Sequence, residues 1–130
     1  MIGSKLFLDS NIWLSYFLGS YIPEIRELLE LPENSLYTSV ISIHEVYKKL
    51  GKVKSGKDPN QAVEFMENNS QIIGVNREIA MAAVQNCEKY KLHTVDSLIY
   101  TSAVEINIVF VTADSDFKNC PNTKILEVKE

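Results

Sequence analysis

The sequence predicts an α/β fold, a three-layer sandwich in which a central parallel sheet lies between two layers of helices. Short apolar runs rich in β-branched residues alternate along the chain with segments of ten or more residues that have helical periodicity. Strands separated by such long helical segments need right-handed crossovers, which make the strands parallel. The chain has 130 residues, so we expect a single domain over residues 1–130 with one hydrophobic core.

The first predicted strand and the two helices after it are marked by local signals. Residues 5–9 form an apolar run that ends in a carboxylate, which is typical of a buried parallel strand. Ser10 can cap a helix that extends through Gly19. Pro23 can open a helix over residues 24–31, because its missing N–H would be unpaired at that position in any protein.

The middle of the chain predicts a second strand over residues 35–38, followed by two helices. The first of these ends near residues 51–56, and its apolar residues at helical spacing are Ile43, Val46, Tyr47, Leu50 and Val53. Asp58 and the proline after it start the second helix, which extends to about Asn69.

The last part of the chain predicts two longer helices. Asn76 caps the first, and Thr94 caps the second, which extends to about Asn107. On the second helix the residues expected to face inward are Val95, Leu98, Ile99, Ser102 and Ile106. We expect the remaining strands over residues 71–75, 108–112 and 123–128, the last of them at an edge of the sheet.

Two carboxylates follow predicted strands. Asp9 ends the first strand, and Asp114 comes two residues after the strand over 108–112. Ligands of open parallel sheets bind beyond the carboxyl ends of the strands, where the strand order reverses, so both side chains are expected in one crevice. Each residue alone also fits a helix cap or a first-turn acid favoured by the helix dipole.

Two further acids lie on predicted helices. Asp96 is in the first turn of its helix, about 80° from the centre of the apolar face, so it is expected at the border between core and solvent. A first-turn acid is also favoured by the helix dipole. Glu45 lies well away from the apolar face of its helix and four residues before Lys49, the spacing of a solvated ion pair. Periodicity alone therefore predicts that Glu45 is a surface residue.

Charge and composition exclude several classes of protein. The 13 basic and 17 acidic residues give a net charge of −4, so nucleic acid cannot be bound through an overall positive field. The apolar runs are too short for a membrane span and no signal segment is recognisable, so we expect a cytoplasmic protein. Cys87, Cys120, His44 and His93 are isolated in the sequence, which argues against a zinc site.

Four segments together resemble the acidic motifs of the PIN domain family, namely Leu8-Asp9-Ser10-Asn11, Ser42-Ile43-His44-Glu45-Val46, Thr94-Val95-Asp96-Ser97-Leu98 and Val111-Thr112-Ala113-Asp114-Ser115-Asp116-Phe117. Their order and spacing are similar to those of the VapC-type ribonucleases of toxin–antitoxin pairs. The resemblance covers essentially the whole chain and implies a Rossmann-like sheet and an Mg²⁺- or Mn²⁺-dependent endoribonuclease. By position it implies that Asp9, Glu45, Asp96 and Asp114 are the acidic site residues and that Asp116 is an accessory acid. It thereby reverses the interpretation of Glu45.

The chemistry of such a set explains a metal requirement. Carboxylates gathered in one cleft raise one another's pKa, and a hard divalent cation such as Mg²⁺ turns that repulsion into binding. We expect Asp9, Asp96 and Asp114 to ligate the metal directly or through water, and Glu45 to hold a water or a second ion. The side chains expected to orient these carboxylates by hydrogen bonds are Asn11, Thr112 and Ser115.

A run of lysines offers a grip on the RNA backbone. Lys48, Lys49, Lys52, Lys54 and Lys57 precede the next acid, Asp58, and each can neutralise one phosphate. The same run also fits a solvated helix end whose cations are favoured by the dipole. Nearby, Trp13, Tyr16 and Phe17 fit either a base-stacking platform or a core or dimer surface.

Two other functions are compatible with the fold. A phosphatase of the haloacid-dehalogenase type also begins with an Asp after the first strand, but it needs a second Asp where this chain has Asn11. A PIN-like module that binds RNA or protein without cleaving is the other alternative. The resemblance further implies an RNA substrate, a cognate antitoxin and a homodimer, for which the apolar pairs Ile12-Trp13, Phe17-Leu18 and Tyr21-Ile22 are a candidate surface.

Overall fold

The computed structural model describes residues 3–19, 23–53 and 57–127. Its centre is a five-stranded sheet with the order β3-β2-β1-β4-β5, and every neighbouring pair of strands is parallel. The strands are β1 (Lys5–Leu8), β2 (Ser35–Ser39), β3 (Gln71–Ile73), β4 (Val109–Thr112) and β5 (Thr123–Ile125). This arrangement confirms the predicted α/β class and the parallel sheet.

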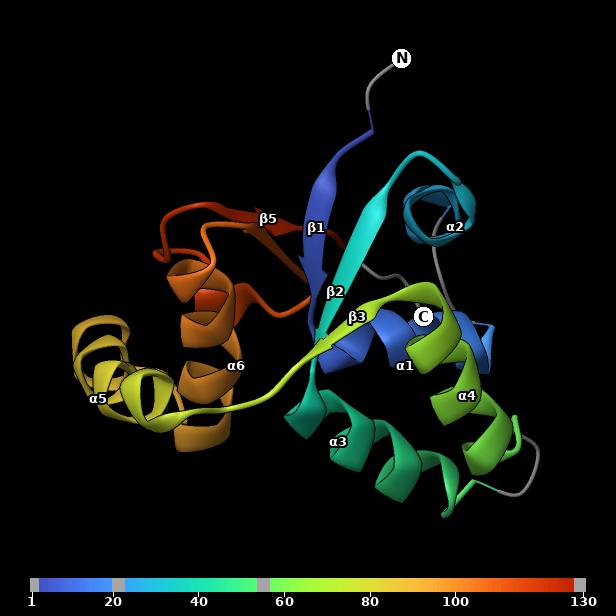
Figure 1. Cartoon of the computed structure of the whole chain (residues 1–130), viewed down its shortest axis with the longest axis horizontal. Helices are drawn as coiled ribbons and strands as arrows, with labels where there is room; N and C mark the ends of the chain where they lie inside the picture. The colour runs from blue at the N-terminus through green and yellow to red at the C-terminus, as the bar shows by residue number, and fades with distance from the viewer. Residues whose placement is uncertain (1–2, 20–22, 54–56, 128–130) are drawn as a thin grey trace.

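Helices cover both faces of the sheet (Figure 1). On one side lie α1 (Ser10–Leu18), α2 (Pro23–Glu30), α3 (Val40–Leu50) and α4 (Pro59–Asn69), and on the other α5 (Arg77–Tyr90) and α6 (Thr94–Glu105). A short 3₁₀ helix, η1 (Ser115–Phe117), follows β4. Among the described residues, no helix combines the length and apolar character that crossing a bilayer requires.

The alternation of side chains along the strands produces one core on each face of the sheet. Leu6 and Leu8 of β1 belong to the core on the face of the sheet that α1 to α4 cover. Phe7, between them, packs with Ile99 and Phe110 on the face that α6 covers. This period of two, with both faces apolar, is the reason that β1 reads as a continuous apolar run in the sequence. The acidic residues begin directly after β1, at Asp9.

Three helix ends differ from the sequence-based expectation. The N-cap of α1 is Asp9, whose side chain accepts a hydrogen bond from the Ser10 N–H, so Ser10 is not the cap. Helix α1 ends at Leu18 because Gly19 takes a left-handed conformation with φ 73° and closes the last turn. The N-cap of α6 is His93, which makes no side-chain capping bond, and Thr94 is the first helical residue.

The aromatic residues of α1 belong to the core. Trp13 is fully buried and donates from Nε1 to Thr38 Oγ1 at 3.1 Å, and Phe65 of α4 packs against the rings of Trp13, Tyr16 and Phe17. The stacking-platform interpretation is therefore wrong. Ile12 is equally buried, so neither it nor Trp13 can form a dimer surface. Residues 21 and 22 of the same expectation lie outside the described residues.

Two apolar residues at the two ends of α6, both predicted to face the core, are exposed: Val95 in the first turn and the C-cap Ile106. Val95 has 42% of its surface exposed and Ile106 has 37%. Helical spacing groups apolar residues on one face, but it does not show where along the helix a neighbouring element ends. Val95 lies at the amino end of α6, beside the acidic residues described next.

Candidate active site

Asp9 is a buried carboxylate at the carboxyl end of β1. It is 5% exposed, and its Oδ1 accepts from the Ser10 N–H at 2.7 Å while its Oδ2 accepts from Thr112 Oγ1 at 2.7 Å. Burial raises the pKa of Asp9 to about 7, although these two hydrogen bonds lower it, and the nearby charges of Asp96 and Glu45 raise it further. The site therefore begins with an acid that is costly to ionise in the absence of a cation.

Asn11 and Thr112 connect the ends of β1 and β4 around this carboxylate. Asn11 Nδ2 donates to Asp9 Oδ2 at 3.3 Å and to Thr112 Oγ1 at 3.2 Å, and Asn11 Oδ1 accepts from the Ala113 N–H at 3.0 Å. Thr112 Oγ1 also accepts from the Asp114 N–H at 3.1 Å. These contacts place two of the predicted supporting residues beside the acids and fix the start of the loop that carries Asp114.

The strands β1 and β4 are neighbours at the point where the strand order reverses, and Asp9 and Asp114 follow them. Asp114 is partly buried and caps η1, accepting from the Asp116 N–H at 2.9 Å. Asp116 and Ser115 are exposed. Within the described part of the chain, the Ser115 hydroxyl makes no hydrogen bond to any of these carboxylates, so the structure does not bring this predicted supporting residue to the acids.

Asp96 enters the same region from the first turn of α6, and it is half-buried as its helical position predicts. Burial raises its pKa, and the charges of Asp114 and Glu45 raise it further, while His93 lowers it. Carboxylates that influence one another in this way share one electrostatic environment. Asp9, Asp96, Asp114 and Glu45 are thus brought together from four separate elements.

Glu45 is held by a serine rather than by a lysine. Ser10 Oγ donates to Glu45 Oε1 at 2.5 Å and lies 2.8 Å from Ser42 Oγ. The ion pairs formed between described residues do not include Glu45 with Lys49, so the surface interpretation from periodicity is wrong. Ser42 is fully buried, and Glu45 lies roughly 60° from it around α3, at the edge of the buried face.

The donor set fits a hard divalent cation in its chemistry. All the acidic groups offer carboxylate oxygens, which Mg²⁺ and Mn²⁺ prefer. Burial, and after it the neighbouring carboxylates, raise the pKa of Asp9 and of Asp96, and a cation would offset this cost of ionisation. Among the described residues, no group of three or more acidic, histidine or cysteine side chains stands at ligand distances from one common point. The structure therefore places several carboxylates in one electrostatic environment, and their oxygens are of the kind that a hard divalent cation prefers.

Three of the predicted lysines lie next to Glu45. Lys48, Lys49 and Lys52 line a cavity of about 440 Å³ that is also lined by Glu45. All three are exposed, as is Lys57, while residue 54 lies outside the described residues. The positive charge is thus local, on a chain whose net charge is −4.

A sequence profile of the PIN domain matches residues 6–122 of the chain. The chain belongs to the PIN domain family. This assignment removes the phosphatase alternative, in agreement with Asn11, which stands where that class needs its second Asp and here donates to Asp9. No curated protein sequence gives a significant match.

Solved structures share the fold of this PIN domain. It is similar to a toxin–antitoxin complex from Klebsiella pneumoniae, with a TM-score of 0.73 and 27% identity over 93% of this chain and 96% of that one. It is also similar to VapBC2 from Rickettsia felis bound to a promoter DNA fragment, with a TM-score of 0.74 and 20% identity over 96% and 99%. VapC20 of Mycobacterium tuberculosis, a toxin that cleaves the sarcin–ricin loop, gives a TM-score of 0.71 at 16% identity over 96% and 99%.

Two buried serines of this PIN domain were not recognised as site residues from the sequence. Ser10 was interpreted as a helix cap and Ser42 only as part of a motif, yet the Ser10 hydroxyl donates to Glu45 and lies within hydrogen-bond distance of the Ser42 hydroxyl. A usable signal was present, because small polar residues next to motif acids at helix starts are common hydrogen-bond partners. Helical-wheel analysis missed it because it counts only apolar residues as the buried face.

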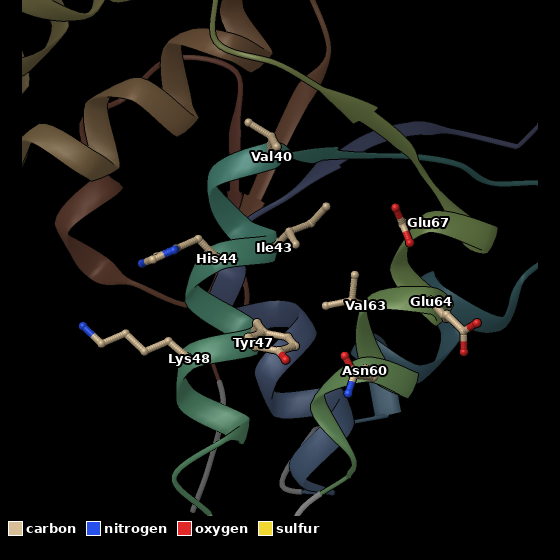
Figure 2. Close-up of a pocket in the computed structure, with 9 residues that line it drawn as sticks. All are labelled: Val40, Ile43, His44, Tyr47, Lys48, Asn60, Val63, Glu64 and Glu67. Carbon is tan, nitrogen blue, oxygen red and sulfur yellow. The ribbon is translucent and has the colours of Figure 1, made fainter.

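Helix α3 of the PIN domain also borders a second hollow, on its other side (Figure 2). This open groove of about 750 Å³ lies between α3 and α4, and Ile43 and Tyr47 face Val63 across it. His44 and Lys48 extend from α3 on the side away from Val63. The apolar residues on the groove side explain why the wheel placed the apolar face too far from Glu45.

Proposed function

We propose that this PIN domain, spanning residues 1–130, is an Mg²⁺- or Mn²⁺-dependent endoribonuclease and the toxin of a toxin–antitoxin pair. The observation that carries the proposal is the gathering of four carboxylates at the carboxyl ends of β1 and β4, with the pKa of Asp9 raised to about 7. Family membership supports nuclease chemistry, and the similar folds solved in toxin–antitoxin complexes support the biological role.

In this proposal Asp9, Asp96 and Asp114 hold the cation, with Asp116 as an accessory acid. Once bound, the cation supplies positive charge at the scissile phosphate and lowers the pKa of a water molecule. Thr112 and Asn11 orient Asp9 by the hydrogen bonds that they donate to it. The backbone N–H of Asp114 donates to Thr112 Oγ1, and this contact positions Asp114.

Glu45 takes the role of proton acceptor or water holder. The Ser10 hydroxyl fixes one of its oxygens, and the other oxygen is left to orient an attacking water or a second ion. Lys48, Lys49 and Lys52 contact RNA phosphates beside the acids. The lysines would then place the strand while the carboxylates act on one phosphodiester.

The test is cleavage of a single-stranded or looped RNA by the purified protein. We expect cleavage with Mg²⁺ or Mn²⁺, no cleavage in excess EDTA, and a loss of at least about 100-fold in Asp9→Asn and Asp114→Asn. Asp58→Asn is the matched control, because Asp58 is an exposed cap of α4 for which Asn is an equivalent cap. Undiminished cleavage in EDTA would sink the metal mechanism, and metal-independent RNA binding without cleavage would favour the non-catalytic alternative.

The toxin role and the assembly have separate tests. We expect growth arrest when the protein is expressed in the cytoplasm of a host cell. Co-expression of a short neighbouring reading frame that encodes the antitoxin should relieve this arrest. For a homodimer, the exposed side chains of Met81 and Val84 on α5 offer an apolar surface. Growth without arrest, using protein that cleaves RNA in vitro, would favour a housekeeping ribonuclease. A monomer at micromolar concentration would remove the dimer.

A further inference from the structure

The cavity that Glu45 shares with the lysines has walls of two chemical kinds. It lies between α3 and the first turn of α6, and its lining includes Ile41, His44, Glu45, Lys48, Lys52 and Val95. Its volume of about 440 Å³ falls within the roughly 300–1,000 Å³ of sites that hold small organic groups. One wall is apolar and the rim is cationic.

Val95 is the least expected of these residues. It is 42% exposed in the first turn of α6, immediately before Asp96, and it lines the cavity together with the half-buried Ile41 of α3. Because 42% of its surface stays open to solvent, part of the apolar Val95 side chain is available to a ligand in the cavity. Two such side chains in one cavity suit a flat apolar ligand group.

The charges around the cavity select an anionic ligand. His44 precedes Lys48 by one turn of α3, and Lys52 lies in the turn just after the helix ends at Leu50, so basic side chains line the cavity from α3 to the turn that follows it. Figure 2 shows His44 and Lys48 extending from α3 on the side away from α4. Among the described residues that line the cavity, Glu45 alone is acidic, and it belongs to the acidic site itself.

A ligand that lies in this cavity therefore joins the acidic site at Glu45. The cavity therefore suits a ligand with a flat apolar group and an adjacent negative charge, placed next to a site for a phosphodiester. One nucleotide of a strand has both features. Flipped or single-stranded bases stack on apolar side chains and on histidine rings, and the phosphates are neutralised by lysines. An acidic peptide would satisfy the lysines but would leave the apolar wall without a planar partner.

We propose that this cavity binds the nucleotide next to the scissile phosphate, with its base against Ile41, Val95 and the His44 ring and its phosphate on Lys48 or Lys52. The inference rests on the proposed function, because it takes the strand at the acids to be RNA. It makes Val95 and His44 determinants of the bases at which the RNA is cut, a property that the carboxylates cannot supply.

The first experiment reads binding without any cleavage. The chain has two histidines, so the imidazole NMR signals of the full-length metal-free protein report separately on His44, in the cavity, and His93, at the start of α6. Ribonucleoside 5′-monophosphates and ribose 5-phosphate are titrated in chelator. We expect nucleotides to shift the His44 signals more than the His93 signals. We also expect the affinity for nucleotides to be about tenfold above that for ribose 5-phosphate, because the base stacks.

Equal affinity for ribose 5-phosphate and for nucleotides would overturn the base pocket, as would nucleotide-induced shifts at His93 alone. Binding of an acidic peptide at His44 with no nucleotide binding would also overturn it, in favour of a protein ligand. If the parent protein cleaves RNA but no nucleotide shifts its His44 signals, the pocket is overturned and the proposed function stands. Nucleotide binding at His44 without RNA cleavage would overturn the proposed function and leave the pocket.

The second experiment uses a matched pair of variants on one helix. Val95 and Val104 both lie on α6 and are 42% and 43% exposed, but only Val95 lines this cavity. Val95→Ser is expected to weaken nucleotide binding about fivefold or more and to change the base distribution at the ends of cleaved RNA. Val104→Ser is expected to leave both unchanged, and equal behaviour of the two folded variants would overturn the proposal.

Discussion

The hydroxyl of Ser10 donates a 2.5 Å hydrogen bond to Oε1 of Glu45, and this contact links the end of β1 to α3. Ser10 directly follows Asp9, so one short segment holds the buried carboxylate with its backbone and the second acid with its side chain. Ser42 Oγ lies 2.8 Å from the same hydroxyl and limits its rotation. The relative placement of Asp9 and Glu45 therefore depends on Ser10.

Ser10→Ala is expected to lower kcat for RNA cleavage by about 10- to 100-fold with little change in KM, because Glu45 loses the group that orients it. The lysines proposed to bind RNA are untouched by this change. Steady-state cleavage kinetics with Mg²⁺ or Mn²⁺ measure the effect.

The matched control is Ser102→Ala. Ser102 is also fully buried, but its hydroxyl donates to the Leu98 carbonyl inside α6. Both variants should lose about 1 kcal/mol of stability, and only Ser10→Ala should lose kcat. A parent-like kcat in Ser10→Ala would show that Glu45 is oriented by other contacts.

The contrast between Asp9 and Glu45 shows how far the sequence predicts this site. Asp9 and Asp114 could be placed because parallel strands end at one edge of the sheet, which is a property of topology. Glu45 could be identified only through the family resemblance, because its helix buries a serine beside it. A helical wheel scores Ser42 as polar and exposed, so it misplaces the buried face and the acid next to it.

The strand and helix order was predictable for a similar reason. Apolar periods of two and of 3.6 residues reflect burial by neighbouring elements, and this chain follows them in β1 and β4. In α5 the period holds for the buried Ile79 and Ala83, whereas Val84 is exposed. The exposure of Val95 and Ile106 was not predictable, since both fit the helical period of α6. Which positions of a regular helix remain uncovered depends on where the neighbouring elements end.

Asp96→Asn is expected to raise the melting temperature of the metal-free protein, or at least not to lower it. The change removes a half-buried charge whose pKa is raised by burial and by Asp114 and Glu45. Mg²⁺ should stabilise the parent by about RT ln(1 + [L]/Kd) and the variant much less. Thermal melts of both proteins in EDTA and in Mg²⁺ give the comparison.

Glu24→Gln provides the control for a purely helical role. Glu24 is an exposed acid in the first turn of α2, so losing its charge should cost roughly 0.3–1 kcal/mol and leave the magnesium shift intact. If Asp96→Asn behaved like Glu24→Gln in both buffers, Asp96 would be a helix-stabilising acid and not a ligand.

The metal-free protein is expected to lose stability as the pH rises from about 4 to about 8. Burial raises the pKa of Asp9 to about 7 in the folded state, against about 3.9 in an unfolded chain. Between these values the folded state retains a proton that the unfolded state has released, so the free energy of unfolding falls with pH. The loss due to Asp9 is up to about 4 kcal/mol, and melting curves in EDTA across this range would show it.

Asp9→Asn isolates this contribution because Asn does not titrate. The difference in melting temperature between variant and parent should grow in favour of the variant as the pH rises. The stabilisation of the parent by Mg²⁺ should also increase with pH, since a cation binds the ionised carboxylate. A difference that is constant across the range would mean that Asp9 is already ionised in the folded protein.

Lys48→Ala combined with Lys52→Ala is expected to weaken RNA binding in chelator and to lower the salt dependence of the affinity. Each lost phosphate contact removes about 0.7 to 1 unit from the slope of log K against log salt, so the double variant should fall by roughly 1.4 to 2 units. Fluorescence anisotropy with a labelled single-stranded RNA at several salt concentrations measures the slope.

Lys118→Ala with Lys124→Ala is the matched control, since both lysines are exposed and lie outside the lining of this cavity. The control removes the same charge from the whole protein, so an equal loss in both variants would indicate a long-range effect of net charge. A lower slope confined to the Lys48 and Lys52 pair would place the RNA backbone along the carboxyl end of α3 and the turn after it, beside Glu45. An unchanged slope would make these lysines solvated residues at the end of α3.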